Sequence, residues 1–305
     1  MKIFPEAVGR ADRLRSLLDS EEILEVPGCF DALSARIVER AGFSAAFLGG
    51  FSVSASRLGL PDVGLMSYGE MIDQARSVCA ATSLPVMGDA DTGYGNAINA
   101  ERTFFGCAQA GLACLMIEDQ CWPKRCGHTA GKEVVERDEA LARIKACVRA
   151  REESGTNVLI MARTDANATD GIDEALWRAS AFSDAGADLT FLEAPENEDQ
   201  MERYCESVPG WKVANLVEDG RTPWQGANRL ESMGYSMVMY PVTLLLHSIE
   251  AMQTAAEQIR NPGASPRPRA TFDEARSLVG WSDYEERLAR VEEDGSTNRE
   301  SKGRG

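Results

Sequence analysis

Short apolar runs alternate with longer amphipathic segments along most of the chain. The apolar runs have the length of strands and cover residues 24–27, 45–49, 84–89, 114–118, 158–163, 189–193, 212–215 and 237–240. Between them, apolar residues recur every three or four positions, as in residues 139–148, and this spacing predicts helices. Eight strands that each precede a helix predict an α/β protein with a (β/α)8 TIM-type barrel.

A Rossmann-type sheet is the alternative architecture. The first strand-to-helix turn lacks the GxGxxG sequence that such a sheet uses to bind a dinucleotide, which counts against it. The length of 305 residues accommodates a barrel, which needs roughly 250. We therefore expect residues 1–260 to form the barrel.

The pattern changes after the eighth predicted strand and its helix. Residues 261–270 contain several prolines and a glycine and predict a linker. Residues 271–291 predict an extra C-terminal helix whose apolar face needs a partner, either the same barrel or a neighbouring subunit. The polar residues 292–305 predict a disordered tail.

Net charge and cysteine usage limit the partners and the cellular setting that we expect for this protein. A net charge of −16 argues against a nucleic-acid partner and against an anionic membrane surface. The first residues lack the apolar core of a signal peptide, and no apolar run approaches the roughly twenty residues of a membrane span. Eight cysteines without a CxxC pair predict free thiols in a reducing, cytoplasmic setting.

Acidic residues follow two neighbouring predicted strands. Asp89 and Asp91 end the third strand, and Glu118 ends the fourth. The carboxyl ends of barrel strands meet at one rim, and oxygen ligands suit Mg²⁺, with Mn²⁺ as a second possibility. Asp62 and Asp119 support this interpretation by their nearby place in the pattern. The alternative is that these acids cap the following helices or face solvent.

The loop after the fourth strand carries the most informative cluster, Lys124-Arg125-Cys126-Gly127-His128. Neighbouring cations lower the pKa of a thiol and make Cys126 a thiolate or a ready proton donor. A glycine at 127 allows close approach to a ligand and movement of the loop. The alternative is a surface thiol in a charged loop. The second histidine, His247, lies in a helical run and is interpreted as structural.

Other polar groups reach the same predicted rim. Arg163 ends the fifth strand, where it can bind a carboxylate or form a salt bridge with a rim acid. Glu193 ends the sixth strand and Asn215 the seventh. Gly49 and Gly50, after the second strand, can offer backbone N–H groups to a carboxylate or form a tight turn.

Six motifs in this order resemble the isocitrate lyase / phosphoenolpyruvate mutase superfamily. They cover residues 57–62, 88–95, 117–120, 124–128, 162–165 and 192–195. The resemblance implies a barrel, Mg²⁺, chemistry on α-keto or α-hydroxy acids, and a homotetramer with C-terminal helices swapped between subunits. The loop with Cys126 resembles the lyase branch, which includes methylisocitrate lyase, and the chain looks closest to carboxyphosphonoenolpyruvate mutase-like members that carry this loop.

The resemblance also implies roles for individual residues. Asp89 and Asp91 would hold Mg²⁺, with Asp62 and Glu118 acting through water, and Cys126 would be the acid. The residues in contact with the substrate would be Gly127, His128, Arg163, Glu193 and Asn215. One departure is that lyases usually carry Tyr-x-Ser-Gly where this chain has Phe47-Leu48-Gly49-Gly50, so two hydroxyl groups are lost.

The sequence therefore predicts a Mg²⁺-dependent carbon–carbon lyase. Its substrate would be a 2-hydroxy di- or tricarboxylate of the methylisocitrate or alkylmalate type, cleaved to an α-keto acid and a carboxylate. Alternatives are hydrolysis of oxaloacetate-like substrates, phosphonate chemistry, and an inactive barrel that serves as a binding module.

Overall fold

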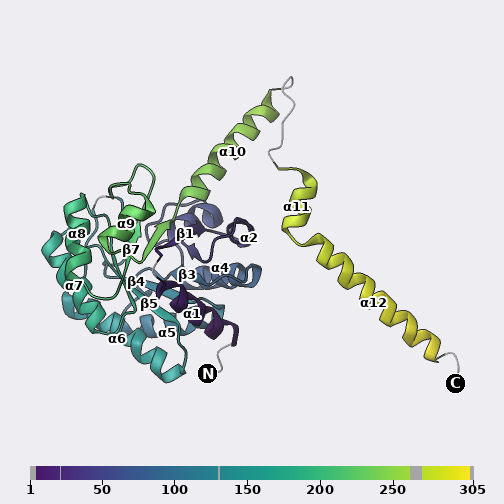
Figure 1. The fold of residues 1–305 in the computed structure, drawn as a ribbon, viewed down its shortest axis with the longest axis horizontal. Helices are drawn as coiled ribbons and strands as arrows, with labels where there is room; N and C mark the ends of the chain where they lie inside the picture. The colour runs from purple at the N-terminus through teal and green to yellow at the C-terminus, as the bar shows by residue number, and fades with distance from the viewer. Residues whose placement is uncertain (1–4, 21, 130, 262–269, 303–305) are drawn as a thin grey trace. The chain divides into compact units, whose positions relative to one another are not determined.

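A closed ring of parallel strands forms the centre of the first of two compact units (Figure 1). The computed structural model describes residues 5–20, 22–129, 131–261 and 270–302. Within these ranges, the strands pair in chain order and β8 pairs with β1. They are β1 (Leu24–Cys29), β2 (Ala46–Leu48), β3 (Val86–Asp89), β4 (Cys114–Glu118), β5 (Leu159–Thr164), β6 (Leu189–Leu192), β7 (Trp211–Asn215) and β8 (Met237–Tyr240). The predicted barrel is confirmed, and the open Rossmann-type sheet is excluded.

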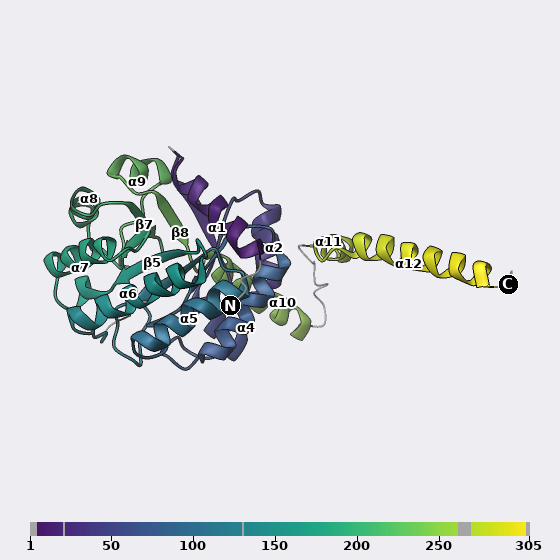
Figure 2. The same ribbon diagram turned by 90° about the horizontal axis from the view of Figure 1, so that it is seen from below.

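Helices surround this ring (Figure 2). They are α1 (Pro5–Leu18), α2 (Ala32–Arg40), α3 (Gly50–Val53), α4 (Tyr68–Ala81), α5 (Ala97–Ala110), α6 (Arg137–Ser154), α7 (Ile172–Asp184), α8 (Glu198–Ser207) and α9 (Ala227–Met233). Helix α10 (Thr243–Arg260) follows β8 and continues into the second unit. Two short irregular turns of helix, η1 (Ser54–Leu58) and η2 (Ala166–Ala168), lie in the connections after β2 and β5. No helix among the described residues is both long enough and apolar enough to cross a membrane.

Apolar side chains fill the barrel and close one of its ends. Leu14 and Leu18 of α1 belong to the same buried cluster as strand residues such as Val26 and Met161. Helix α1 precedes β1, so these contacts lie toward the amino-terminal ends of the strands. The opposite, carboxyl-terminal rim is left for polar groups, as is usual in barrel enzymes.

Strand register sets which polar groups meet at that rim. Glu118, the last residue of β4, pairs in register with Arg163 of β5, and Asn215 of β7 pairs with Met239 of β8. The charged side chains of Glu118 and Arg163, 45 residues apart in the chain, therefore lie side by side.

The second unit comprises residues from Glu250 onward, so the division falls inside α10, whereas a boundary at residue 260 was predicted. Residues 262–269 of the predicted linker lie outside the described residues. The single helix expected over residues 271–291 is two helices, α11 (Phe272–Leu278) and α12 (Trp281–Lys302). Gly280 between them has a φ of +74°, a left-handed conformation that favours glycine and ends a helix. Helix α12 continues to Lys302, where a disordered tail was expected.

Candidate active site

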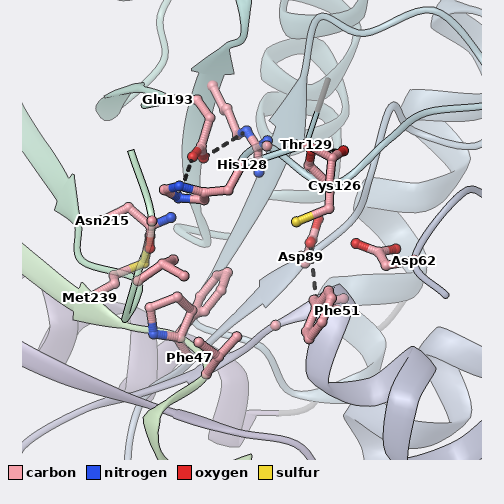
Figure 3. A pocket seen from close by; sticks show the side chains of 18 of the residues that line it. Phe47, Phe51, Asp62, Asp89, Cys126, His128, Thr129, Glu193, Asn215 and Met239 are labelled. Carbon is pink, nitrogen blue, oxygen red and sulfur yellow. Dashed lines mark hydrogen bonds and ion pairs between the residues drawn. The ribbon is translucent and has the colours of Figure 1, made fainter. Parts of the chain in front are cut away.

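A cavity of about 320 Å³ opens among the loops that follow the strands (Figure 3). All the predicted site residues line it except Asp91 and Glu118, which are buried beside it. Those that line it are Gly49, Gly50, Asp62, Asp89, Cys126, Gly127, His128, Arg163, Glu193 and Asn215. The cavity lining therefore combines residues from the ends of β2, β3, β5, β6 and β7 with residues from the loops after β2 and β4.

A lysine ammonium group lies within the predicted metal site. Nζ of Lys124 is 2.7 Å from a carboxylate oxygen of Asp62 and 2.8 Å from Oδ1 of Asp91, and its side chain is only 3 % exposed. Burial by itself would lower the pKa of Lys124, but Asp91, Asp89 and Glu118 outweigh burial and raise it well above its ordinary value. Lys124 is therefore a fixed positive charge between the acids.

The buried acids around Lys124 have raised pKa values and few other cationic partners. Burial raises the pKa of Asp91 to about 6, although Lys124 counteracts it, and burial also raises the pKa of Glu118 well above its ordinary value. Oε1 and Oε2 of Glu118 accept no hydrogen bond, and the nearest cation to Oε2 is Nη1 of Arg163 at 3.5 Å. The charge and the free oxygens of this cluster fit a hard cation. No group of three or more acidic, histidine or cysteine side chains within the described ranges is already arranged around a metal position.

Asp89 is held by the backbone of two neighbouring segments. Gly50 donates its N–H to Oδ2 of Asp89 at 3.2 Å, and Asp91 donates its N–H to Oδ1 at 2.9 Å. A Cβ at Gly50 would lie 2.7 Å from Oδ2, so the close approach requires glycine. The N–H of Gly50 that was expected to bind a substrate carboxylate is thus engaged by Asp89.

Cys126 is a partly buried thiol, and the predicted lowering of its pKa is wrong. Burial raises the pKa of Cys126 above its ordinary value of 9.0; a hydrogen bond from the His128 backbone lowers it less strongly, and Glu193 raises it further. The sequence placed Arg125 beside the thiol, but desolvation outweighs such neighbours here. Cys126 is therefore a protonated thiol at neutral pH.

Gln120 holds the loop that carries Cys126. Its side chain donates to the carbonyl of Arg125 and accepts from the N–H of Arg125, both at 2.9 Å. Thr129 closes the other side of Cys126, because its N–H and its hydroxyl group both donate to the Cys126 carbonyl. The backbone on both sides of the thiol is therefore fixed.

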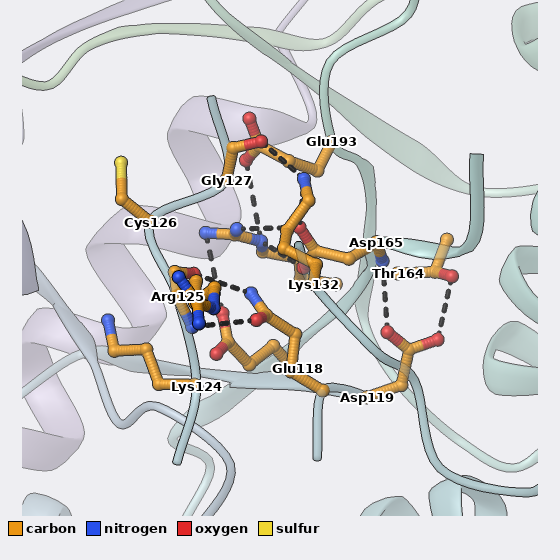
Figure 4. Close-up of polar contacts among 12 residues, drawn as sticks. Glu118, Asp119, Lys124, Arg125, Cys126, Gly127, Lys132, Thr164, Asp165 and Glu193 are labelled. Carbon is orange, nitrogen blue, oxygen red and sulfur yellow. Dashed lines mark hydrogen bonds and ion pairs between the residues drawn. The ribbon is translucent and has the colours of Figure 1, made fainter. Parts of the chain in front are cut away.

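The buried carboxylate of Asp165 (labelled in Figure 4) holds Arg163. Its Nε and Nη2 donate to the two oxygens of Asp165 at 2.9 and 3.0 Å. Lys132 also donates to Asp165, at 2.9 Å, and to the carbonyl of Gly127. Asp165 thus fixes the cation that lines the cavity and, through Lys132, the loop. The salt bridge considered as an alternative for Arg163 is present, and Arg163 lines the cavity as well.

His128 contacts a carboxylate that stays ionised. Its Nε2 lies 3.0 Å from Oε1 of Glu193, and Nε of Arg163 lies 3.4 Å from Oε2. Burial would raise the pKa of Glu193, but Arg163 and His128 together lower it to about 2. A Cβ at Gly127 would lie 2.5 Å from Nη2 of Arg163 and equally close to Glu193, so this loop position requires glycine. On the neighbouring strand end, Oδ1 of Asn215 is buried without a hydrogen-bond partner and is open to a ligand.

A family model described as phosphoenolpyruvate phosphomutase matches residues 14–260. The chain belongs to this family. A 2,3-dimethylmalate lyase of Eubacterium barkeri is 40 % identical over 95 % of this chain and 99 % of its own length. A 2-methylisocitrate lyase of Halalkalibacterium halodurans is 38 % identical over 90 % of this chain and 91 % of its own. The superfamily identified from the motifs is therefore confirmed.

Solved structures with similar sequences have the same fold. Oxaloacetate acetylhydrolase in complex with 3,3-difluorooxalacetate has a TM-score of 0.90 at 32 % identity, and the match covers 93 % of this chain and 97 % of that one. Phosphonopyruvate hydrolase in complex with oxalate and Mg²⁺ has a TM-score of 0.79 at 26 % identity, covering 93 % and 98 %.

Sequence reasoning missed the roles of three parts of this site. Lys132 and its partner Asp165 act through other residues, so no strand-end pattern points to their pairing. Val217–Gly220 also line the cavity. Here a signal existed, because Glu218-Asp219-Gly220 follows β7 as Asp91-Thr92-Gly93 follows β3.

The sequence suggested that Asp119 belongs to the acidic cluster, but in the structure its side chain points elsewhere. It accepts from the hydroxyl group of Thr164 at 2.7 Å and from the N–H of Asp165 at 2.9 Å (Figure 4). It also accepts from Nη1 of Arg178 at 3.2 Å. It therefore braces the start of the segment that holds Asp165. Burial, followed by the charge of Asp165, raises the pKa of Asp119 to about 6.

This raised pKa predicts a pH-dependent stability difference. The folded state binds the proton of Asp119 up to about pH 6, whereas the unfolded chain releases it near 3.8. The contribution of Asp119 is therefore full below 3.8 and is lost as the pH rises through 6. Asp119→Asn cannot ionise. We therefore expect the free energy of unfolding of this variant, relative to that of wild type, to increase by about 2 kcal/mol from pH 4 to pH 7. Urea unfolding at both pH values measures the difference, and a constant gap between the two proteins would contradict the assignment.

Proposed function

We propose that this cavity cleaves the bond between C2 and C3 of a 2-hydroxy dicarboxylate or tricarboxylate. The products would be an α-keto acid and a second carboxylate. The observation that carries the proposal is a protonated thiol, that of Cys126, which faces the same cavity as Arg163 and the acidic cluster. Such a cleavage needs a held carboxylate and a proton donor at C3, and these groups supply both.

In the proposed reaction, one proton leaves the hydroxyl group on C2 and one proton is added to C3. A base takes the proton of the C2 hydroxyl group, the C2–C3 bond breaks, and C2 becomes the keto carbon. The electron pair remains on C3, next to its carboxylate, and Cys126 Sγ donates its proton there. Arg163 stabilises the charge that develops on this carboxylate, since Asp165 holds its guanidinium in one orientation.

Asp89, Asp91, Asp62 and Glu118 would hold Mg²⁺ in this proposal. A bound Mg²⁺ would polarise the oxygen atoms at C1 and C2 of the substrate. The charge of the cluster and the free oxygens of Glu118 support this assignment.

The cavity walls favour an alkyl-substituted dicarboxylate over a tricarboxylate. Among the lining residues, the cationic and histidine side chains are Lys124, His128 and Arg163, and each already contacts an acid. A third carboxylate would have to share them or face Glu218 and Asp219. Much of the remaining wall is apolar and is formed by Phe47, Met116, Phe191, Met239, Val242 and Leu246.

Hydrolysis of oxaloacetate is the second candidate. It is favoured by the TM-score of 0.90 with oxaloacetate acetylhydrolase. On this site, water would add to the C2 keto carbon of oxaloacetate and lose a proton to a base. The C2–C3 bond would then break to give oxalate and, after protonation of C3, acetate.

Proton NMR of the purified protein with Mg²⁺ and a panel of acids tests the proposal. The panel contains 2-alkylmalates, 2,3-dimethylmalate, methylisocitrate, isocitrate, oxaloacetate and phosphonopyruvate. We expect a keto acid from an alkylmalate, and a loss of turnover of about 100-fold or more in Cys126→Ser, the size of general-acid catalysis. Cys121→Ser is the matched control, because Cys121 lies in the same loop outside the cavity.

The outcomes separate the candidates. Acetate and oxalate from oxaloacetate, without cleavage of a hydroxy acid, would establish the hydrolase instead. Full activity of Cys126→Ser would contradict the role of the thiol as acid. No product from any substrate would favour a binding module without catalysis.

Metal binding is expected to compete with Lys124. Because the Lys124 ammonium group pairs with Asp62 and Asp91, Lys124→Met should bind Mg²⁺ more tightly than wild type, by about tenfold or 1.4 kcal/mol. Calorimetric titration measures this without turnover. Lys145→Met, which removes an exposed lysine of α6, is the control and should titrate as wild type. No heat of binding in either wild type or Lys124→Met would contradict the metal assignment.

We also propose a homotetramer with exchanged C-terminal helices. In support, α11 contains no buried residue, and α11 and α12 expose the apolar side chains of Phe272, Trp281, Tyr284 and Val291. Sedimentation equilibrium should give four times the chain mass of 33.2 kDa. Truncation after residue 261 should lower the oligomeric state, and a wild-type protein that sediments as a monomer would contradict this proposal.

A further inference from the structure

The turn after β7 contacts the ring of His128. Gly220 donates its N–H to the carbonyl of Val217 at 3.0 Å, and Asp219 has a φ of +57°, so the chain reverses sharply here. The next residue, Arg221, donates its backbone N–H to Nδ1 of His128 at 3.1 Å. The turn thus reaches back to a loop that lies 93 residues earlier in the chain.

This contact determines where a neutral His128 carries its proton. A ring nitrogen that accepts a hydrogen bond has no hydrogen of its own, so the proton of a neutral ring must be on Nε2. A proton on Nε2 would face the carboxylate of Glu193, whose Oε1 lies 3.0 Å away, although the two atoms do not meet the geometry of a hydrogen bond. The ring has a donor on one side and an anion on the other, and its side chain is only 12 % exposed.

Glycine is required for this contact to form. A Cβ at Gly220 would lie 2.8 Å from Nδ1 and 3.0 Å from Cε1 of His128, and 2.9 Å from the carbonyl oxygen of Val217. Any other residue would push the ring or the turn away. Gly226, six residues later in the same connection, has no atom within 4 Å of such a Cβ.

We infer that Gly220 is a positioning residue that, through the N–H of Arg221, keeps His128 in its Nε2-protonated tautomer. Neither ring nitrogen then offers a free lone pair. In terms of the proposed function, on which this consequence rests, His128 cannot be the base that takes the C2 hydroxyl proton. It acts as a hydrogen-bond donor toward Glu193 or toward an oxygen of the substrate that comes between them.

Nitrogen-15 NMR of the histidine rings tests the tautomer directly. The chain has two histidines, so His247→Gln, a change in a helix outside the cavity, assigns the signals of His128. Spectra are recorded at about pH 8.5, above the ordinary histidine pKa of about 6.5. We expect a protonated Nε2 and an unprotonated Nδ1. A protonated Nδ1, a doubly protonated ring, or averaged signals of two tautomers would each overturn the inference.

Gly220→Ala and Gly226→Ala test the role of the turn. We expect Gly220→Ala to give averaged or shifted ring signals for His128 and Gly226→Ala to leave them as in wild type. Unchanged signals in a folded Gly220→Ala protein would overturn the role of Gly220. If that variant does not fold, the wild-type spectrum still decides the tautomer.

The test is independent of turnover. A protein that forms no product from the panel but shows the Nε2-protonated ring contradicts the proposed function and leaves this inference standing. A protein that cleaves an alkylmalate but shows the other tautomer supports the proposed function and overturns this inference.

Discussion

A buried carboxylate, that of Asp165, joins the rigid barrel to the loop that carries the thiol. It has no exposed surface, and it pairs with Arg163 on one side and with Lys132 on the other. Lys132 in turn donates to the carbonyl of Gly127, next to Cys126. Without Asp165, two buried cations would lose a partner, and a broken buried pair typically costs about 3–5 kcal/mol. The relative position of guanidinium group and thiol therefore depends on this one side chain.

Much of the barrel and its rim could be predicted from the sequence. The strands are continuous apolar runs because both faces of a parallel strand are buried, and their ends are polar because they meet at one rim. Asp62, Asp89, Cys126 and Arg163 line one cavity for that reason. What the pattern could not supply is the direction of a side chain after the strand ends. Asp119 follows Glu118 directly but turns toward Thr164.

The remaining differences have a common physical origin. The sequence shows which charges are neighbours along the chain, whereas pKa values depend on burial and on neighbours in space. Arg125 precedes Cys126, yet burial dominates the thiol. The break at Gly280 was missed for a different reason. The apolar pattern continues across residues 271–291, and only the left-handed backbone conformation of one glycine interrupts the helix.

The ammonium group of Lys124 means that the acidic cluster carries its own counter-ion. At the proposed metal site, a divalent ion would then displace an ammonium group that already pairs with the acids. Without a metal, this ammonium group offsets part of the repulsion among the carboxylates of Asp62, Asp89, Asp91 and Glu118. The apparent affinity of the proposed site for Mg²⁺ would then depend on how strongly the Lys124 ammonium group competes for the same carboxylates.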